Sequence, residues 1–297
     1  MPTLLSLHVI AYINIKQYYK GVMQLKKVGF IGIGIMGSAL ATAARKVLDP
    51  DDVIIYDRTL DKCQSLANEI KCKIAHSPQE IVDSAHYIIL SVQPDQVIPL
   101  LNQLLPTFQS HYKKGEQRII ACIAAGCDLC IFDQLFQSVQ IDMPVIRIMP
   151  NIPLRVGKGV LIFARNQVAT DEDVYGLMDN FREGGLCEYA DEKTLLAATP
   201  VFGCSPAYVY MFIEALADGG SEIGLNRDMS IRLAAMATLG SAAMVLESGL
   251  HVAQLRDELA TPGGMTITST NEMERMGFRG ALIQGVLTAY KRSLDMT

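Results

Sequence analysis

Short apolar runs alternate with helical patterns along the first part of the chain, and this alternation stops near residue 190. A continuous apolar run such as Tyr87–Val92 is typical of a strand that is covered on both faces of a parallel sheet. The expected strands are 27–31, 53–56, 73–75, 87–92, 118–123 and 145–148, extended by 159–163 and 186–189. Longer helical segments are expected at 195–198, 206–224, 227–247 and 265–293. The pattern therefore predicts an α/β domain followed by an all-α domain.

A glycine-rich turn follows the first expected strand. Gly32, Gly34 and Gly37 form the pattern G-x-G-x-x-G, and an alanine-rich helical segment from Ser38 to Val47 comes directly after it. In such a turn the first glycine allows a tight bend, the second lets a pyrophosphate approach the backbone, and the third lets the helix pack on the strand. This context predicts a Rossmann-type doubly wound parallel sheet that binds a dinucleotide. The alternative is a structural glycine turn without a nucleotide.

The end of the second strand bears on which dinucleotide binds. Asp57 suits the ribose 2′-hydroxyl of NADH, whereas Arg58 and Thr59 suit the 2′-phosphate of NADPH. An Asp beside an Arg is also compatible with a solvated ion pair of little energetic value. We favour NADPH and keep NADH as the alternative.

Three further strands end in small or polar residues, which parallel pairing would bring to one edge of the sheet. These ends are Gln93-Pro94, Ala124–Gly126 and Met149–Asn151. The residues expected to bind the cofactor are Gly32, Gly34, Ile35, Met36, Gly37, Asp57, Arg58, Thr59, Val92, Gln93, Pro94, Ala124, Ala125, Gly126 and Asn151.

The helical half has too little polar surface for the exterior of a monomer. The segment Pro206–Ile213 is apolar almost all round, and a helix of this kind belongs inside a larger body. We therefore expect an obligate dimer. We disfavour membrane helices because charges recur every few residues along this half.

A helix-breaking loop, Thr261-Pro262-Gly263-Gly264, interrupts the helical half and is followed at once by a helical pattern that begins at Met265-Thr266-Ile267. Such a loop places backbone N–H groups and two hydroxyls at a helix N-terminus, which is a suitable site for a carboxylate. The alternative is a plain interhelical turn.

Composition narrows the classes of function. The chain has 297 residues, 50% of them hydrophobic, and a formal net charge of -5 without a basic cluster, so we expect no nucleic-acid binding. Its seven cysteines argue against a secreted disulfide scaffold. Cys122, Cys127 and Cys130 match the start of an iron–sulfur pattern, but they lie around an apolar run. We interpret them as small buried hydrophobic residues and expect no metal.

Within the first 22 residues the apolar stretch Leu4–Ile15 is too short to span a bilayer, and the segment lacks the features of a signal peptide. We interpret residues 1–22 as a dispensable extension outside the native chain, residues 23–189 as the dinucleotide-binding domain and residues 190–297 as the dimerisation and substrate domain. Without an export signal, we expect a cytoplasmic protein.

From Met23 onward the chain resembles the pyrroline-5-carboxylate reductases. The shared motifs in the first half are Gly29–Gly37, Ala124–Gly126 and Met149–Asn151. Those in the helical half are Gly203–Tyr208, Phe212–Gly219, the loop Thr261–Ile267 and Gly277–Gly280. The glycine-rich turn is common to many dehydrogenases, whereas the motifs of the helical half are specific to this family.

The resemblance implies reduction of 1-pyrroline-5-carboxylate to L-proline by hydride transfer from NAD(P)H, the last step of proline biosynthesis. It implies an interlocked homodimer, often assembled into larger rings such as a decamer, in which one subunit's dinucleotide domain works with its partner's helical domain. By the same likeness Thr266 hydrogen-bonds the imine nitrogen as the catalytic residue. The residues that bind the substrate are Thr261, Pro262, Gly263, Gly264 and Ser205.

Several positions depart from the family pattern. Gln93 stands where a lysine is usual, which weakens the inference about cofactor preference. Cys204 replaces a serine, and we interpret it as structural. His251 has unusual neighbours, and we interpret it as a satisfied or surface histidine.

Two alternatives remain open. One is a reductase of another cyclic imino acid or a related small acid, although the helical half has no convincing lysine base for hydroxy-acid chemistry. The other is a catalytically silent dinucleotide-binding sensor.

Overall fold

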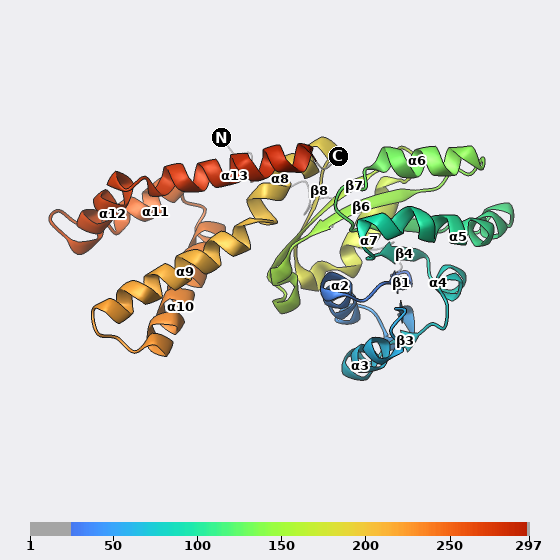
Figure 1. Cartoon of the computed structure of the whole chain (residues 1–297), viewed down its shortest axis with the longest axis horizontal. Helices are drawn as coiled ribbons and strands as arrows, with labels where there is room; N and C mark the ends of the chain where they lie inside the picture. Colours follow the sequence, from blue (N-terminus) through green and yellow to red (C-terminus); the bar gives the residue numbers. More distant parts are fainter. Residues whose placement is uncertain (1–24, 296–297) are drawn as a thin grey trace. The chain divides into compact units, whose positions relative to one another are not determined.

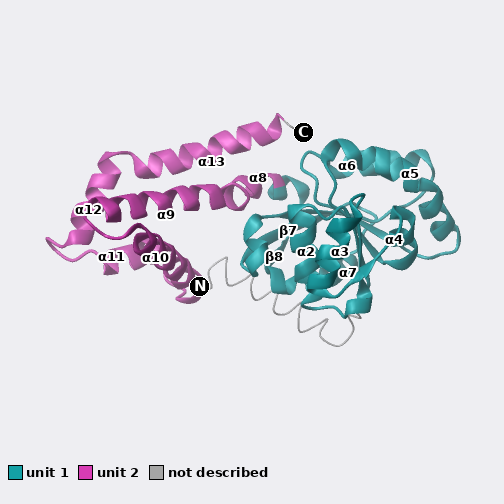
Figure 2. Ribbon diagram, turned by 60° about the horizontal axis from the view of Figure 1, so that its bottom comes forward, with its two compact units in different colours: residues 1–195, 297 teal, residues 196–296 magenta. Residues whose placement is uncertain are grey.

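The computed structural model describes residues 25–295, so the expectation for residues 1–22 lies outside the described part of the chain. The chain forms two compact units, divided between Leu195 and Leu196 (Figure 2). The first unit holds the sheet, and the second is helical.

The first unit is built on an eight-stranded sheet with the order β3-β2-β1-β4-β5-β6-β7-β8. The strands are β1 Val28–Ile31, β2 Val53–Tyr56, β3 Lys73–Ile74, β4 Tyr87–Leu90, β5 Ile119–Cys122, β6 Val145–Pro150, β7 Gly159–Arg165 and β8 Gly185–Tyr189. The order changes direction between β1 and β4, as in doubly wound sheets, so the predicted fold class is confirmed.

The sheet departs from an all-parallel arrangement at one pairing: β7 pairs antiparallel with β6, with Ile148 opposite Phe163. The connection between them contains only the short 3-10 helix η2, Ile152–Val156. A parallel crossover needs a dozen or more residues, so this short connection returns the chain in the opposite direction. β8 then pairs parallel with β7.

Helices cover both faces of the sheet (Figure 1). They are α2 Ile35–Arg45, α3 Leu60–Ile70, α4 Pro78–Ser84, α5 Pro94–Lys113, α6 Leu129–Ser138 and α7 Asp171–Asn180, with the 3-10 helices η1 Pro50–Asp52 and η3 Arg182–Gly184. Leu40, Leu66 and Leu177 of α2, α3 and α7 share one core with Phe30 and Ile89 of the sheet.

Sequence reasoning missed α5, which contains Pro99 and Pro106. Proline usually ends a helix because it lacks an N–H donor and its ring clashes with the preceding turn. Here Val97, Leu101, Leu104 and Phe108 of α5 are buried, and their packing holds the helix together across both prolines. The burial of this face outweighs the local preference.

The second unit contains helices separated by short loops. They are α8 Glu192–Phe202, which begins in the first unit, α9 Ser205–Glu222, α10 Arg227–Glu247, α11 Val252–Glu258, α12 Met265–Arg275 and α13 Phe278–Leu294. The prediction of one helix over 265–293 is wrong, because Gly277 adopts φ +79° and separates α12 from α13. The short helix α11 was not predicted.

Large apolar side chains of α9 and α10 face outward. Met211, Ile223, Met236 and Leu246 are between 66% and 81% exposed. The segments Glu192–Glu222 and Arg227–Glu247 are long and apolar enough to cross a membrane. The expectation against membrane helices stays a prediction for these two segments. Length and composition alone do not distinguish lipid from a protein partner.

Candidate functional site

The glycine-rich turn between β1 and α2 is shaped by close backbone contacts. The N–H of Gly32 donates to the carbonyl of Tyr56 at 2.8 Å, and Gly32 adopts φ +92°. A Cβ at Gly37 would collide with the carbonyl of Gly32 and lie 2.5 Å from Ser91 Oγ. By contrast, a Cβ at Gly34 would meet no other atom within 4 Å. Gly32 and Gly37 therefore preserve the turn, while Gly34 leaves open space beside it.

That open space belongs to a cavity of about 510 Å³ at the carboxyl ends of β1, β2 and β4. The structure brings together seven of the predicted cofactor residues in its lining: Gly32, Gly34, Asp57, Arg58, Thr59, Val92 and Gln93. It does not place the remaining eight in this lining: Ile35, Met36, Gly37, Pro94, Ala124, Ala125, Gly126 and Asn151. The cavity lies within the first unit, at the edge where open α/β sheets bind ligands.

The carboxylate of Asp57 accepts hydrogen bonds from two backbone segments at this edge of the sheet. The N–H of Ile33 donates to its Oδ2 at 3.0 Å, and the N–H of Thr59 donates to its Oδ1 at 2.9 Å. Partial burial opposes ionisation, but these two backbone hydrogen bonds and nearby Lys62 bring the pKa of Asp57 below its usual value. The carboxylate therefore fastens the glycine-rich turn to the end of β2.

Two cations line the cavity near Asp57. Arg58 and Lys62 are exposed, and neither forms an ion pair with an acidic residue in the range 25–295. The solvated Asp57–Arg58 pair considered from the sequence is therefore absent from the described part of the chain. Sequence reasoning missed Lys62, which lies near the start of α3, close after Thr59. Its signal was a second cation just beyond the end of β2.

Asn151 has a structural contact of its own. Its Oδ1 accepts a hydrogen bond from the N–H of Val160 at 2.8 Å, and the residue is 8% exposed. This bond ties the end of β6 to β7. The amide oxygen of Asn151 is thus already engaged with backbone.

The sequence did not reveal a buried charged cluster around Arg147, which pairs with Cys122 at the end of β5. Arg147 is 1% exposed and forms two ion pairs. One is with Asp128, the N-cap of α6. The other is with Glu192, the first residue of α8, at 2.7 Å. Glu192 also accepts from the N–H of Leu129 at 2.9 Å. The two carboxylates balance the buried guanidinium, although its Nε has no hydrogen-bond partner among the described residues.

The loop Thr261–Gly264 forms a tight turn before α12. Gly263 adopts φ +69°, and the N–H of Gly264 donates to the carbonyl of Thr261 at 3.0 Å. Gly264 is the N-cap of α12, and no side chain caps the helix. The N–H groups of the first turn, at Met265, Thr266 and Ile267, therefore lack acceptors within the helix.

Thr266 lines a second cavity, of about 520 Å³, within the helical unit. Its carbonyl accepts from the hydroxyls of Ser269 and Thr270, at 3.1 and 2.9 Å. The predicted substrate residues Thr261, Pro262, Gly263, Gly264 and Ser205 do not line this cavity. Ser205 begins α9 near α8, whereas the loop between α11 and α12 lies at the other end of the helical unit (Figures 1 and 2).

His251 also lines the second cavity, but its ring is engaged locally. Its Nδ1 accepts from the N–H of Ala253 at 3.2 Å, and the backbone N–H of His251 donates to Gln254 Oε1 at 3.1 Å. His251 is the N-cap of α11. This agrees with its interpretation as a satisfied histidine.

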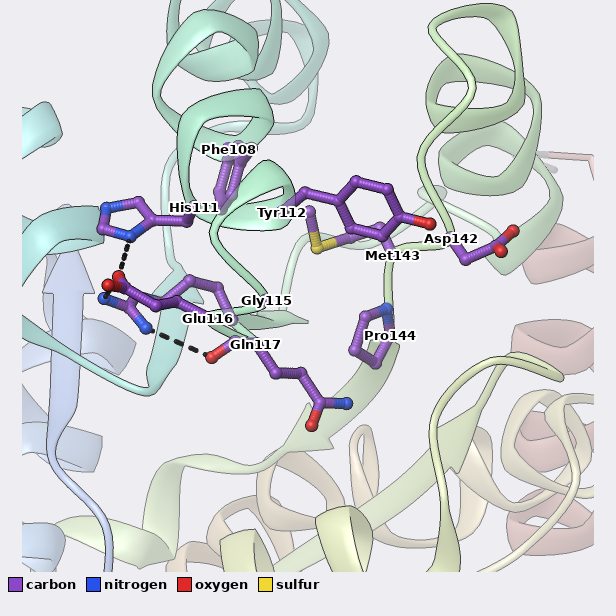
Figure 3. A pocket seen from close by; sticks show the side chains of 10 residues that line it. Phe108, His111, Tyr112, Gly115, Glu116, Gln117, Asp142, Met143 and Pro144 are labelled. Carbon is purple, nitrogen blue, oxygen red and sulfur yellow. Dashed lines mark hydrogen bonds and ion pairs between the residues drawn. The ribbon is translucent and has the colours of Figure 1, made fainter.

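A smaller cavity of about 240 Å³ lies beside the amino ends of β5 and β6 (Figure 3). His111 lies at its edge, with Nδ1 2.6 Å from Glu116 and Nε2 2.8 Å from Asp83. Arg118 contacts Glu116 at 3.4 Å. These charges compensate one another, and the position is opposite to the edge that binds ligands in such sheets. We assign this cluster a structural role.

The glycine-rich turn at the switch point of the doubly wound sheet defines the class as a dinucleotide-binding protein with a helical second domain. The family description "NADP oxidoreductase coenzyme F420-dependent" matches residues 27–117, and "Pyrroline-5-carboxylate reductase dimerisation" matches residues 192–296. The chain is 35% identical to the pyrroline-5-carboxylate reductase of Escherichia coli over 271 residues, which is 90% of this chain and 97% of that one. It is also 35% identical to the enzyme of Glycine max, over 91% of this chain and 95% of that one. The chain belongs to the pyrroline-5-carboxylate reductase family.

Solved structures agree with this assignment. A Plasmodium falciparum pyrroline carboxylate reductase with NADP bound matches with a TM-score of 0.78 and 30% identity, over 92% of this chain and 99% of that one. A 1-pyrroline-5-carboxylate reductase from Streptococcus pyogenes matches with a TM-score of 0.72 and 27% identity, over 90% and 98% of the two chains. The similarity therefore spans both units.

Proposed function

We propose that this protein reduces 1-pyrroline-5-carboxylate to L-proline with hydride from NAD(P)H, the last step of proline biosynthesis. The observation that carries the proposal is the membership of the family along nine-tenths of the chain. In this assignment residues 23–189 bind the dinucleotide, and residues 190–297 bind the substrate and form the dimer.

The residues of the first cavity fit a dinucleotide. Gly34 leaves space where any larger residue would place a Cβ, and Gly32 and Gly37 hold the turn around it. When bound, the cofactor supplies the hydride for the C=N carbon of the substrate, and the nitrogen of the substrate's pyrroline ring becomes a secondary ammonium. The protein binds and orients the two partners, since this chemistry needs no strong nucleophile.

The loop before α12 offers groups for the substrate. The free N–H groups of Met265, Thr266 and Ile267 lie at a helix N-terminus, which favours a carboxylate. Gly264 contributes little to this clamp, because its N–H is already bonded to Thr261. The hydroxyl of Thr266 is the group that we assign to the imine nitrogen.

We infer that NADPH is preferred, because Arg58 and Lys62 form no ion pair within residues 25–295 and border the same cavity as Asp57. Arg58→Ala should therefore weaken NADPH binding by about 10-fold or more, the loss of one charge-assisted hydrogen bond, and leave NADH binding nearly unchanged. Titration of the fluorescence of each reduced cofactor measures both affinities. Equal losses for the two cofactors would contradict a contact with the 2′-phosphate.

We propose that a second copy of the chain covers the exposed apolar faces of α9 and α10, giving a homodimer that can assemble further, for example into a decamer. In this proposal a protein partner, and not lipid, covers those helices. We also propose that the enzyme is cytoplasmic. A dimer also allows Ser205 of one subunit to lie near the loop Thr261–Gly264 of the other, although the two are at opposite ends of one helical unit.

A charge placed on this surface tests the dimer. Met236→Lys should shift sedimentation velocity towards the monomer, because Met236 is 66% exposed and a buried lysine in the dimer would be costly. Glu69→Lys on the exposed side of α3 is the control and should sediment as the wild type. An unchanged sedimentation coefficient of Met236→Lys would argue against burial of this face.

The activity is tested with purified protein, 1-pyrroline-5-carboxylate and either NADPH or NADH. Oxidation of the cofactor and formation of proline are followed together. Absence of turnover with both cofactors would overturn the proposal and favour a dinucleotide-binding sensor, and turnover of another cyclic imine in place of this substrate would favour the alternative reductase.

A further inference from the structure

The loop between β5 and α6 is held at both ends by one buried residue, Arg147 of β6. The backbone of Arg147 lies opposite Cys122, the last residue of β5, in the parallel pairing of the two strands. Its guanidinium forms an ion pair with Asp128, the N-cap of α6. Residues 123–127 therefore connect two points that Arg147 fixes.

Glu192 holds the guanidinium from a second direction. Its Oε1 accepts a hydrogen bond from Nη1 of Arg147 at 2.7 Å and another from the N–H of Leu129 at 2.9 Å. Arg147 is 1% exposed, so displacing its guanidinium would leave charged groups without their partners in a buried environment, which is costly. The ion pairs therefore make the start of α6 a fixed point of the first unit.

The loop offers backbone groups to a ligand. Ala124, Ala125 and Gly126 carry no polar side chain, Ala125 is exposed, and Gly126 adopts φ +74°. The N–H groups of Ala125 and Gly126 donate to no acceptor within residues 25–295. Small side chains let a ligand come close to such N–H groups. What this loop can bind therefore depends on where its backbone lies.

The loop follows the strand next to the first cavity. β5 pairs with β4, and Val92 and Gln93, which follow β4, line that cavity. In this fold a dinucleotide extends across the switch point, with its adenosine ribose at the end of β2 and its other half on the far side of β1. A dinucleotide in the first cavity would therefore extend its nicotinamide half towards the ends of β4 and β5.

We propose that Arg147 is a positioning residue for the nicotinamide half of the dinucleotide. With Asp128 it holds the loop Ala124–Gly126 in place, so that the free N–H groups of Ala125 and Gly126 can bind that half. Arg147 is itself buried and acts through the loop. This role rests on the proposed function, because it takes NADPH as the ligand of the first unit.

Asp128→Ala tests the ion pair that reaches the loop. The substitution removes the contact with Arg147 but no helix cap, because the side chain of Asp128 makes no capping hydrogen bond. NADPH binding should weaken by about tenfold, whereas binding of adenosine 2′,5′-bisphosphate, which lacks the nicotinamide half, should change by less than about twofold. NADPH fluorescence measures the first affinity, and competition against NADPH measures the second.

Asp133→Ala is the matched control on the same helix. Oδ1 of Asp133 accepts a hydrogen bond from Nδ2 of Asn166 at 2.7 Å, so this substitution also removes a partly buried contact of α6. The control should bind both ligands as the wild type does, and differential scanning fluorimetry should show that each variant is folded. If Asp128→Ala does not fold, Asp128→Asn keeps the size of the side chain without its charge and should show the same selective loss at smaller magnitude.

The two ligands separate a positioning role from a purely structural one. Equal losses for NADPH and the bisphosphate in Asp128→Ala would indicate a general loosening of the first unit and would overturn the proposal. Unchanged binding of both ligands by the folded variant would overturn it too, as would a selective loss in Asp133→Ala. Failure of the wild type to bind NADPH would count against the proposed function instead.

Discussion

Replacing Thr266 by alanine is expected to lower kcat/KM for 1-pyrroline-5-carboxylate by about 10- to 100-fold, the loss of one hydrogen bond to a charged group of about 1.5–3 kcal/mol. Thr266 lies in the first turn of α12 and lines the second cavity. The substrate nitrogen gains full positive character during reduction, so the contact should matter most in the transition state. Steady-state kinetics with saturating NADPH measure this loss.

Thr268→Ala is the matched control for Thr266→Ala. Its hydroxyl donates to the carbonyl of Gly264 at 3.0 Å, and the residue is exposed, so removal should change kcat/KM little. Both variants should bind NADPH as the wild type does. A large loss of NADPH affinity in Thr266→Ala would show that the loop serves the cofactor instead of the substrate.

Gly34→Ala should weaken NADPH binding by about 10- to 100-fold while leaving the melting temperature nearly unchanged. The added methyl meets no protein atom within 4 Å, so the folded protein accepts it. It would instead occupy the space into which the pyrophosphate has to come close to the backbone. Differential scanning fluorimetry and NADPH titration separate the two effects.

Gly37→Ala is the comparison variant, in which the melting temperature should fall. Its methyl would lie 2.5 Å from Ser91 Oγ and collide with the carbonyl of Gly32, so the fold itself should be destabilised. If Gly34→Ala bound NADPH as tightly as the wild type, the assignment of the cavity to the dinucleotide would be wrong. A fall in its melting temperature matching that of Gly37→Ala would contradict the open space at Gly34.

Much of the sheet domain was predictable because its signals are local. The apolar run at Tyr87–Leu90 is a buried strand, and Ser77 caps α4 by accepting from the N–H of Glu80 at 3.1 Å, as a Ser-Pro helix start predicts. The glycine-rich turn likewise follows from the steric limits on residues other than glycine. Patterns of this kind depend on a few neighbouring residues, which the sequence contains directly.

Other features arise from partners far along the chain. The helix α5 continues through Pro99 and Pro106 because one of its faces is buried, and Phe108 on this face packs against Phe136 of α6. Asp57, which lines the candidate cofactor cavity, also accepts hydrogen bonds from the backbone N–H groups of Ile33 and Thr59. The cluster of Arg147 with Asp128 and Glu192 joins three separated segments, and no local pattern reveals it.

By itself, the sequence determined the alternation of strands and helices, the glycine-rich turn and the loop before α12, because φ restrictions and side-chain periodicity act over a few residues. Only the tertiary structure decided the antiparallel return of β7, the break at Gly277 and the ion-pair cluster around Arg147. These depend on which distant surfaces pack together and on the direction in which short connections return the chain. That information lies in the sum of many weak contacts, and no single stretch of residues carries it.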